Sequence, residues 1–233
     1  MIFKNFSNLI YAVSTISDAN MSFKTGPKEE VLANRQRFAQ KIGIEPNFIS
    51  VHQVHGNKVL VVSNNDLGKS EKEADAIITK EPNIFLLIGS ADCLAISFSD
   101  PKNKTIGLSH AGWRGLDKKI IKQTIFKMKQ HFKTDPRDLI IEISPSIGPC
   151  HYGNLSLKNK KSWEKYFSKD ADNSKGLDLW QAAKDQLTKE GVPDKNIANL
   201  KVCTFDNKNY FSNRRSNLTK EPDSRFATIL GVK

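Results

Sequence analysis

Apolar and polar positions alternate along this chain in blocks that predict short strands and amphipathic helices. A first strand is expected at residues 9–14, followed by a polar loop at residues 17–26. Pro27 then opens the segment PKEEVLANRQRFAQKIG, in which acidic residues come early, basic residues come late, and Gly43 stands at the end. This order matches the helix dipole and the usual end residues, so the segment predicts a helix of about four turns.

The middle of the chain carries the longest apolar runs, which predict buried strands. Two short β-rich segments, FISVHQVHG and KVLVVS, meet at His55-Gly56-Asn57, where glycine and asparagine favour a tight turn. After the polar residues 64–74 come the apolar segments DAIIT, NIFLLIGSADCLAISFSD and TIGLSHAGWRG. Such unbroken runs are typical of strands covered on both faces, so these segments are expected to form a central sheet.

The second half of the chain alternates between helical and strand patterns. The spacing of apolar residues in GLDKKIIKQTIFKMKQHF predicts one helix that begins directly after the HAGWRG loop. DLIIEISPSIGPC predicts a buried strand, a Lys-rich helical or irregular stretch reaches residue 175, and LDLWQAAKDQLTKEGV predicts a helix ended by Gly191 and Pro193. KVCTF and the C-terminal residues predict two more strands. We therefore expect an α/β (α+β) fold, with residues 1–233 as a single domain and a central mixed β-sheet flanked by helices.

Composition and charge narrow the class of protein. The hydrophobic fraction of 38% and the charged fraction of 26% are those of a globular protein. A net charge of +11 attracts anions, which include nucleic acid, anionic membranes and phosphate-bearing small molecules. The lysines interleave with apolar residues at helical spacing, which favours solvated helix faces over a nucleic-acid surface. We expect no nucleic-acid partner.

The three cysteines indicate a reducing compartment. Cys93, Cys150 and Cys203 are odd in number and far apart in sequence, unlike a secreted disulfide framework. The first residues show no signal-peptide pattern, and the most apolar stretch is too short for a membrane span and carries Asp92. We expect a cytoplasmic protein without a membrane partner.

Two of the five histidines stand beside glycines at predicted strand ends, and a cysteine lies between them. His55 is in QVHG, His110 is in SHAG, and Cys93 is in ADC. A thiolate and two imidazoles suit a zinc ion that keeps a fourth position open. Because the spacing is too wide for a compact finger-like motif, a structural cysteine with two hydrogen-bonded histidines stays an alternative. His52 would point to the opposite face if this segment is a strand.

Arginines mark a second kind of candidate, an anion site. Arg114 and the glycines of HAGWRG precede a predicted helix N-terminus, where backbone amides favour phosphate. The alternative is that Arg114 pairs with a local carboxylate and the glycines only permit a turn. Arg214 and Arg215, in FSNRRS, either clamp a phosphate or are surface charges.

Taken together, these motifs resemble the YfiH-like or laccase-domain family, formerly named polyphenol oxidases. The similarity spans most of the chain, and three motifs hold the zinc ligands of the family, which here are His55, Cys93 and His110. The segments that carry the similarity are VST at 13–15, ANRQR at 33–37, HQVHGNKV at 52–59, ADAIIT at 74–79, SADCLAISFSD at 90–100, GLSHAGWRGL at 107–116, SIGPCHYG at 146–153 and CTFDNKNYFSNRR at 203–215.

The resemblance implies a zinc-dependent purine nucleoside enzyme. Members of the family are described as phosphorolysing adenosine, inosine and methylthioadenosine and as deaminating adenosine, whereas the older laccase name reflects oxidation of phenols with copper. Besides the three ligands, which would also be the catalytic residues, the resemblance suggests Arg35, Arg114 and Arg214 as groups that hold phosphate or ribose. Gln53 and Asp92 would be polar neighbours of the metal. The partners expected are purine nucleosides and phosphate, for a monomer or a homodimer.

The chain departs from the family pattern at three places. Ile16 stands where the family has an arginine, in a shortened N-terminal loop. His151 replaces the second cysteine of GPCCY, and TKEPDSR replaces the usual TGR near the end. The three ligand motifs are intact, so metal binding is expected even if the substrate differs.

Three alternatives stay open. A copper phenol oxidase would need more histidines than the five present if it were a multicopper enzyme. A Cys–His hydrolase would use Cys93 as a nucleophile activated by His110 or His55. A basic nucleic-acid-binding protein would leave the Gly-rich loops with His, Cys and Arg unexplained.

Overall fold

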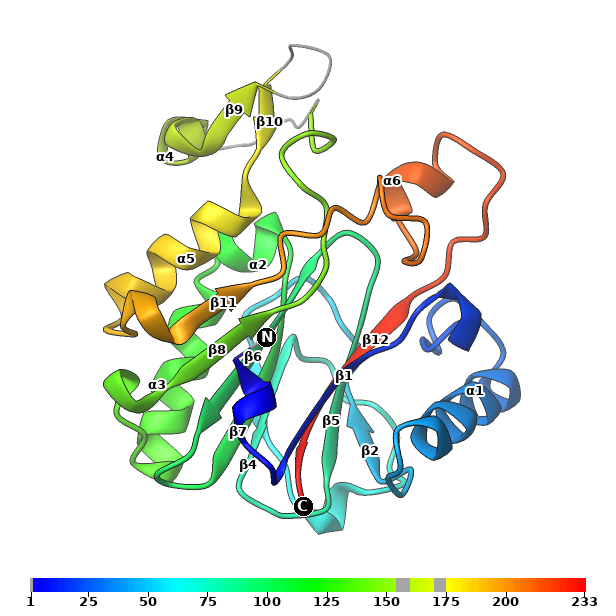
Figure 1. Ribbon diagram of the computed structural model, residues 1–233, viewed down its shortest axis with the longest axis vertical. Coiled ribbons are helices and arrows are strands. Elements are labelled where there is room, and N and C mark those ends of the chain that lie inside the picture. The colour runs from blue at the N-terminus through cyan, green and yellow to red at the C-terminus, as the bar shows by residue number, and fades with distance from the viewer. Residues whose placement is uncertain (1, 154–159, 170–174) are drawn as a thin grey trace.

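The computed structural model of the protein describes residues 2–153, 160–169 and 175–233. In this part of the chain the strands form two mixed sheets and a small two-stranded sheet at one end (Figure 1). The first sheet has the order β1 (Leu9–Val13), β12 (Phe226–Val232), β5 (Phe85–Ser90), β2 (Phe48–Ser50). The second has the order β11 (Ile197–Asn199), β8 (Ile140–Ile143), β6 (Leu94–Asp100), β7 (Thr105–Ala111), β4 (Ala76–Thr79), β3 (Val59–Val61). The small sheet pairs β9 (Phe167–Lys169) with β10 (Lys175–Leu177).

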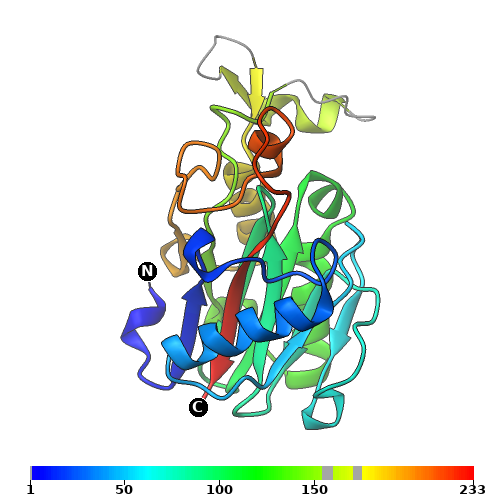
Figure 2. The same ribbon diagram turned by 90° about the vertical axis from the view of Figure 1, so that its right-hand side faces the viewer.

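Helices cover the outer faces of the two large sheets, which gives four layers (Figures 1 and 2). One helix, α1, lies across the first sheet, and α2, α3 and α5 lie against the second. Short helices α4 and α6 stand near the end that carries the small sheet. The bounds are α1 Lys28–Lys41, α2 Trp113–Asp117, α3 Ile120–Phe132, α4 Lys160–Trp163, α5 Leu179–Lys189 and α6 Asn213–Ser216.

The alternation of side chains along the strands explains why the layers stack in this way. On β5, Leu86 and Ile88 enter the core between the two sheets, whereas Phe85 and Leu87 pack with Phe38 of α1 on the other face. Successive residues of a strand point to opposite faces, so a strand that is apolar throughout must be covered on both sides. The expected α/β class is confirmed, with two packed mixed sheets where one central sheet was expected.

Several predicted elements differ from the structure. The segments FISVHQVHG and KVLVVS do not form a hairpin, because β2 pairs with β5 in one sheet and β3 pairs with β4 in the other. The predicted single helix after HAGWRG divides into α2 and α3 at Lys119, whose φ of 65° lies in the left-handed region. KVCTF is not a strand; β11 ends before it, and only Cys203 makes an isolated bridge, to Ser146.

Other predicted elements are confirmed. The N-terminal strand, the helix after Pro27, the helix at α5 and the C-terminal strand lie where their patterns placed them. The Lys-rich stretch before residue 175 lies partly outside the described residues, and its described part holds α4 and β9. Among the described residues, no helix is both long and apolar enough to cross a bilayer.

Candidate metal centre

The side chains of His55, Cys93 and His110, called here the His55 site, meet beside the ends of two neighbouring strands. His110 lies near the carboxyl end of β7, and Cys93 immediately precedes β6, which runs antiparallel to β7. His55 comes from the loop between β2 and β3 and has a φ of 58°. The ligand atoms of the three residues all lie within 4.8 Å of one another. The fold thus brings together the three residues that the sequence motifs indicated.

The orientation of the three side chains suits joint coordination of one ion. Cys93 Sγ lies 3.9 Å from His55 Nε2. The two imidazole rings face each other edge to face, with centroids 4.7 Å apart and planes at 79°. For a tetrahedral zinc with bonds of about 2.0 to 2.3 Å, a sulfur and a nitrogen ligand are about 3.6 Å apart, so little movement separates the observed arrangement from a coordinating one.

Gly112 makes room for this arrangement. A Cβ at residue 112 would lie 2.6 Å from Cys93 Sγ and 3.4 Å from His55 Cδ2. The first distance is far inside van der Waals contact, so any side chain here would displace the thiolate or the loop. The glycine of HAGWRG therefore serves the close approach of backbone to the ligands.

Asp75, which the sequence reasoning did not select, holds two of the ligands in place. Its Oδ1 lies 2.8 Å from His110 Nδ1, and its carboxylate also accepts hydrogen bonds from the backbone amides of His55 at 2.9 Å and Gly56 at 2.6 Å. The residue is completely buried. A carboxylate on the distal nitrogen of a metal-binding histidine fixes its ring and raises its basicity. The signal in the sequence was a lone acid directly before the buried strand β4.

The charges of the site favour a thiolate beside an imidazolium when no metal is bound. Burial alone would raise the pKa of Cys93, but the charge of His110 and hydrogen bonds from both histidines lower that pKa below its ordinary value. Burial alone would lower the pKa of His110, yet the charge of Cys93 and the hydrogen bond to Asp75 raise it. A cysteine that ionises this readily is ready to bind a metal or to act as a nucleophile.

The donor set fits zinc. One sulfur and two imidazole nitrogens are the ligands that zinc takes at catalytic sites, where protein groups occupy three positions and leave the fourth open. All three residues line a cavity of about 570 Å³, so the open side of the set faces a space of ligand size.

Two arginines line the same cavity and bring positive charge to it. Arg114 is exposed, and its guanidinium lies 4.5 Å from the ring centroid of Trp113. Arg214 donates one hydrogen bond to the carbonyl of Gly153 at 2.7 Å, and its guanidinium lies 5.9 Å from the ring centroid of Tyr152. The cavity therefore combines cations with aromatic faces.

The other three predicted residues also line the cavity, but their polar groups are engaged by the protein. Arg35 is buried, donates twice to the carbonyl of Met21 and bonds Ser50 Oγ at 2.9 Å. Gln53 makes a pair of hydrogen bonds with the backbone of Gly89. These contacts give Arg35 and Gln53 a role in shaping the wall of the cavity.

Asp92 is likewise committed to the protein. Its two carboxylate oxygens accept hydrogen bonds from Thr204 Oγ1 at 2.7 Å and from the backbone amide of Arg214 at 2.6 Å. The residue has a φ of 87° and directly precedes Cys93. Asp92 thus ties the turn that presents Cys93 to the segment that carries Arg214.

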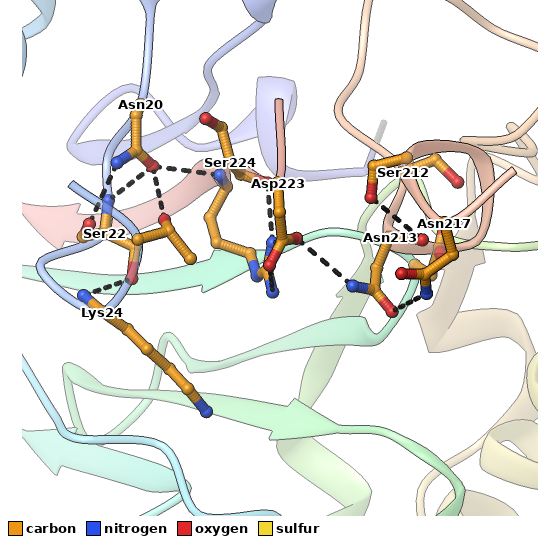
Figure 3. A network of polar contacts seen from close by, with 12 residues as sticks. Asn20, Ser22, Lys24, Ser212, Asn213, Asn217, Asp223 and Ser224 are labelled. Atoms are coloured by element: carbon orange, nitrogen blue, oxygen red, sulfur yellow. Dashed lines mark hydrogen bonds and ion pairs between the residues drawn. The ribbon is translucent and has the colours of Figure 1, made fainter. Parts of the chain in front are cut away.

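A polar network at the rim joins segments far apart in the sequence (Figure 3). Asn20 Oδ1 accepts from the amides of Ser22 at 3.2 Å and Arg225 at 3.0 Å. The Arg225 guanidinium bonds Asp223, which in turn accepts from Asn213 of α6 at 3.2 Å. The shortened N-terminal loop and the segment that replaces TGR are therefore bonded to each other at the edge of the cavity.

Comparison with known proteins agrees with this architecture. The chain is 27% identical over 238 residues to a purine nucleoside phosphorylase of Bacteroides thetaiotaomicron, covering 91% of this chain and 88% of the relative. It is 30% identical over 212 residues to a purine nucleoside phosphorylase of Haemophilus influenzae, covering 87% and 82%. The crystal structure of YlmD from Geobacillus stearothermophilus superposes with a TM-score of 0.87 at 25% identity, covering 98% of this chain and 93% of that one.

The family of the chain follows from the whole-length match. The model of the multi-copper polyphenol oxidoreductase laccase family matches residues 7–233. This span includes both large sheets, the His55 site and the cavity. The chain therefore belongs to the multi-copper polyphenol oxidoreductase laccase family, and the resemblance inferred from its motifs is confirmed.

Proposed function

We propose that the protein is a zinc-dependent purine nucleoside phosphorylase that converts adenosine, inosine and methylthioadenosine into the free base and the corresponding pentose 1-phosphate. The observation that carries the proposal is the convergence of His55, Cys93 and His110 on a cavity that also presents Arg114 and Arg214. The names of the relatives support it. We take residues 1–233 as one domain, acting in the reducing cytoplasm, where its cysteines stay free as in the structure.

The residues of the site would divide the work as follows. When bound, a zinc ion held by His55, Cys93 and His110 would supply Lewis-acid chemistry. Asp75 accepts a hydrogen bond at His110 Nδ1, which leaves Nε2 of that ring as its ligand atom. Asp75 also bonds the amide of His55, so one carboxylate positions both histidines.

The arginines and aromatic rings would hold the two substrates. In phosphorolysis the bond between C1′ of the pentose and N9 of the purine breaks, a phosphate oxygen joins C1′, and the base leaves with a proton. The pentose carbon becomes cationic on the way, so a phosphate held close to it stabilises the transition state. Arg114 and Arg214 supply positive charge for that phosphate, and Trp113 and Tyr152 offer aromatic surface for a purine.

We also propose adenosine deamination in the same cavity. Zinc deaminases attack C6 of adenine with an activated water and release ammonia. This reaction needs no phosphate, so the two activities separate in one assay: hypoxanthine or adenine appears only with phosphate, whereas inosine and ammonia appear without it.

The test of the proposed function combines metal analysis with product analysis. Purified protein is assayed for zinc by mass spectrometry, and adenosine and inosine are incubated with and without phosphate and chromatographed. We expect bound zinc and phosphate-dependent release of free base. His110→Ala should lose the zinc of the His55 site and the release of free base. The matched control is His131→Ala, since His131 lies on α3 beside Phe132 and outside the cavity. Turnover that persists unchanged in His110→Ala would refute the assignment.

A Cys–His hydrolase is the second candidate, because the site also contains a Cys93–His110–Asp75 series. The lowered pKa of Cys93 and the 2.8 Å contact of His110 with Asp75 are features of an activated nucleophile. The two candidates give opposite results on chelation. A phosphorylase that needs zinc loses turnover when zinc is removed and regains it on readdition, whereas a cysteine hydrolase keeps its activity without metal and loses it on alkylation of Cys93.

The copper oxidase suggested by the family's description is tested in the same preparation. Multinuclear copper centres use many histidines, and this chain has five. Copper-loaded protein that oxidises phenols at a rate comparable to nucleoside turnover would favour the oxidase. We expect nucleoside turnover with zinc to exceed it.

A further inference from the structure

A second group of side chains that could bind a metal lies in two loops outside the His55 site. Cys150 and His151 follow β8, and Cys203 and Asp206 follow β11. Their ligand atoms all lie within 4.8 Å of one another. These four residues, called here the Cys150 cluster, share no member with the His55 site and take no part in the proposed phosphorolysis.

The backbone fixes the two loops side by side independently of any ion. Ser146 and Cys203 form an isolated parallel bridge. The amide of Ser146 donates to the carbonyl of Val202 at 3.1 Å, and the amide of Thr204 donates to the carbonyl of Ser146 at 3.1 Å. The fold therefore holds the two loops together at Ser146 and Cys203, which places the residues of the Cys150 cluster near one another.

Three contacts within the Cys150 cluster have lengths close to the edges of a zinc tetrahedron. His151 Nδ1 lies 3.4 Å from Asp206 Oδ1, Cys150 Sγ lies 3.6 Å from Asp206 Oδ2, and Cys203 Sγ lies 3.9 Å from His151 Nδ1. Zinc bonds of about 2.3 Å to sulfur and about 2.0 to 2.2 Å to nitrogen or oxygen give tetrahedral edges of about 3.4 Å for N–O and about 3.6 Å for S–O or S–N. These three separations are within about 0.3 Å of such edges. The two oxygens of Asp206 face His151 and Cys150 separately, and the other ligand pairs are separated by up to 4.8 Å, so the side chains need a small adjustment to bind one ion.

The surroundings of the cluster hold its ligands in place. The amide of Gly148 donates to Cys203 Sγ at 3.3 Å, which stabilises negative charge on that sulfur. The ring of His151 stacks on Phe205, with centroids 4.2 Å apart and planes at 17°. A Cβ at residue 148 would lie 3.0 Å from Cys150 Sγ and 2.9 Å from the Trp180 ring, so the absence of a side chain at Gly148 permits this packing.

We propose that Cys150, His151, Cys203 and Asp206 bind a second, structural zinc ion. Four protein ligands, two of them sulfurs, form a closed site of the structural kind. Two thiolates and an imidazole select zinc over the hard ions calcium and magnesium, which take oxygen ligands. Cys203 is 9% exposed, whereas Asp206 is 57% exposed, so the ion would enter from the Asp206 side.

The second ion would hold two loops of the protein together. It would join the loop that carries Tyr152 to the segment that leads to Arg214, and both residues line the cavity of the His55 site. Thr204, next to Cys203, bonds Asp92 at 2.7 Å. The ion would thus fix one wall of the cavity without touching the substrate.

Metal counting with paired variants tests the proposal. In the wild-type protein purified under reducing conditions we expect about two equivalents of zinc per chain. The double variant Cys93→Ser, His110→Ala removes the His55 site and should keep one equivalent of zinc, at the Cys150 cluster. Cys150→Ser should also keep one equivalent, at the His55 site. His151→Cys should keep both, since a thiolate can replace the imidazole in a zinc site, whereas His151→Ala should lose one and the matched control His131→Ala none.

The absorption spectrum of bound cobalt(II) reports the ligands of the ion directly, within a single protein. The Cys93→Ser, His110→Ala protein, reconstituted with cobalt(II), should show the intense thiolate-to-cobalt absorption and visible bands of a tetrahedral site, and a chelator should abolish them and lower its melting temperature. A lack of these bands in that protein, when it is folded by circular dichroism, would overturn the proposal. So would a Cys150–Cys203 disulfide in protein kept reduced.

The result also separates this proposal from the proposed function. If the His55 site binds no zinc, the wild-type protein would carry one equivalent that survives Cys93→Ser and is lost in Cys150→Ser. If the Cys150 cluster binds none, the single equivalent would show the reverse dependence.

Discussion

Replacing Gly112 with alanine perturbs the His55 site through one contact that the structure defines. Gly112 has φ −73° and ψ 174°, a conformation that alanine adopts without strain. The only cost of the substitution is therefore the space its methyl group needs. That methyl would lie 2.6 Å from Cys93 Sγ.

The size of the effect follows from this distance. A carbon and a sulfur atom in contact are separated by at least about 3.5 Å, so the sulfur or the loop must move by about 1 Å. Zinc ligands tolerate displacements of about 0.2 Å, and altered supporting contacts typically cost about 10-fold to 100-fold in metal affinity. We expect Gly112→Ala to weaken zinc binding at the His55 site by at least about tenfold and to lower turnover about 100-fold. Overpacking should destabilise the metal-free chain by about 1–3 kcal/mol.

The assay compares zinc affinity with folding stability. Wild type, Gly112→Ala and the matched control Gly115→Ala are titrated with a competing chelator, with Cys93→Ser as the reference that lacks this site. A Cβ at residue 115 meets nothing closer than the His110 carbonyl at 3.4 Å, an ordinary contact, so Gly115→Ala should bind zinc like wild type. Thermal unfolding of the chelated proteins separates loss of the site from loss of the fold. Gly112→Ala with wild-type zinc affinity and turnover would refute the steric reasoning and the assignment of Cys93 as a ligand.

Three further outcomes are expected. Asp75→Asn should reduce zinc affinity about 10-fold to 100-fold, because the charge that orients His110 is lost; unchanged affinity in chelator competition would contradict the role given to Asp75. Arg114→Ala should raise the KM for phosphate about 10-fold to 100-fold and leave the zinc content unchanged, as expected for loss of a charge-assisted hydrogen bond. The control is Arg137→Ala, which should change neither quantity, because Arg137 is exposed and paired with Asp135. In chelated protein, Cys93 should be alkylated well below the pH at which an ordinary thiol reacts, because its pKa is lowered. Burial and neighbouring anions raise the pKa of Cys150 to about 12, so Cys150 should react slowly at neutral pH. Equal alkylation rates of the two cysteines by mass spectrometry would contradict this order.

The glycine-flanked histidine motifs together with the family resemblance pointed to the three candidate ligands, His55, Cys93 and His110. The glycines beside His55 and His110 marked strand ends, and the unbroken apolar runs around Cys93 marked strands buried on both faces. Both features are short-range consequences of chain geometry, so they can be read without knowing which strands pair.

Features that depend on contacts between residues far apart in the chain could not be predicted from the sequence. Asp75 precedes His110 by 35 positions, and its role emerges only when β4 pairs with β7. The division of the apolar run around Cys93 into β5 and β6, in different sheets, depends on the turn at Asp92, where a non-glycine residue takes a positive φ. Arg35 and Gln53 matched family motifs, yet their hydrogen bonds with Met21 and Gly89 could not be inferred from those motifs.

Asp92 gives a physical reason to expect the two candidate metal sites to be coupled. Its backbone presents Cys93 to the His55 site, and its carboxylate bonds Thr204, which adjoins Cys203 of the Cys150 cluster. Both carboxylate oxygens are satisfied by the protein, so a shift of the 203–206 loop cannot be absorbed without breaking a buried charge-assisted hydrogen bond. The same carboxylate also bonds the amide of Arg214, a cavity residue. Loss of the second ion should therefore displace Arg214 more than the candidate ligand Cys93, because Cys93 is also held by the strand that begins at Leu94. We expect the KM for phosphate to change more than the zinc affinity of the His55 site.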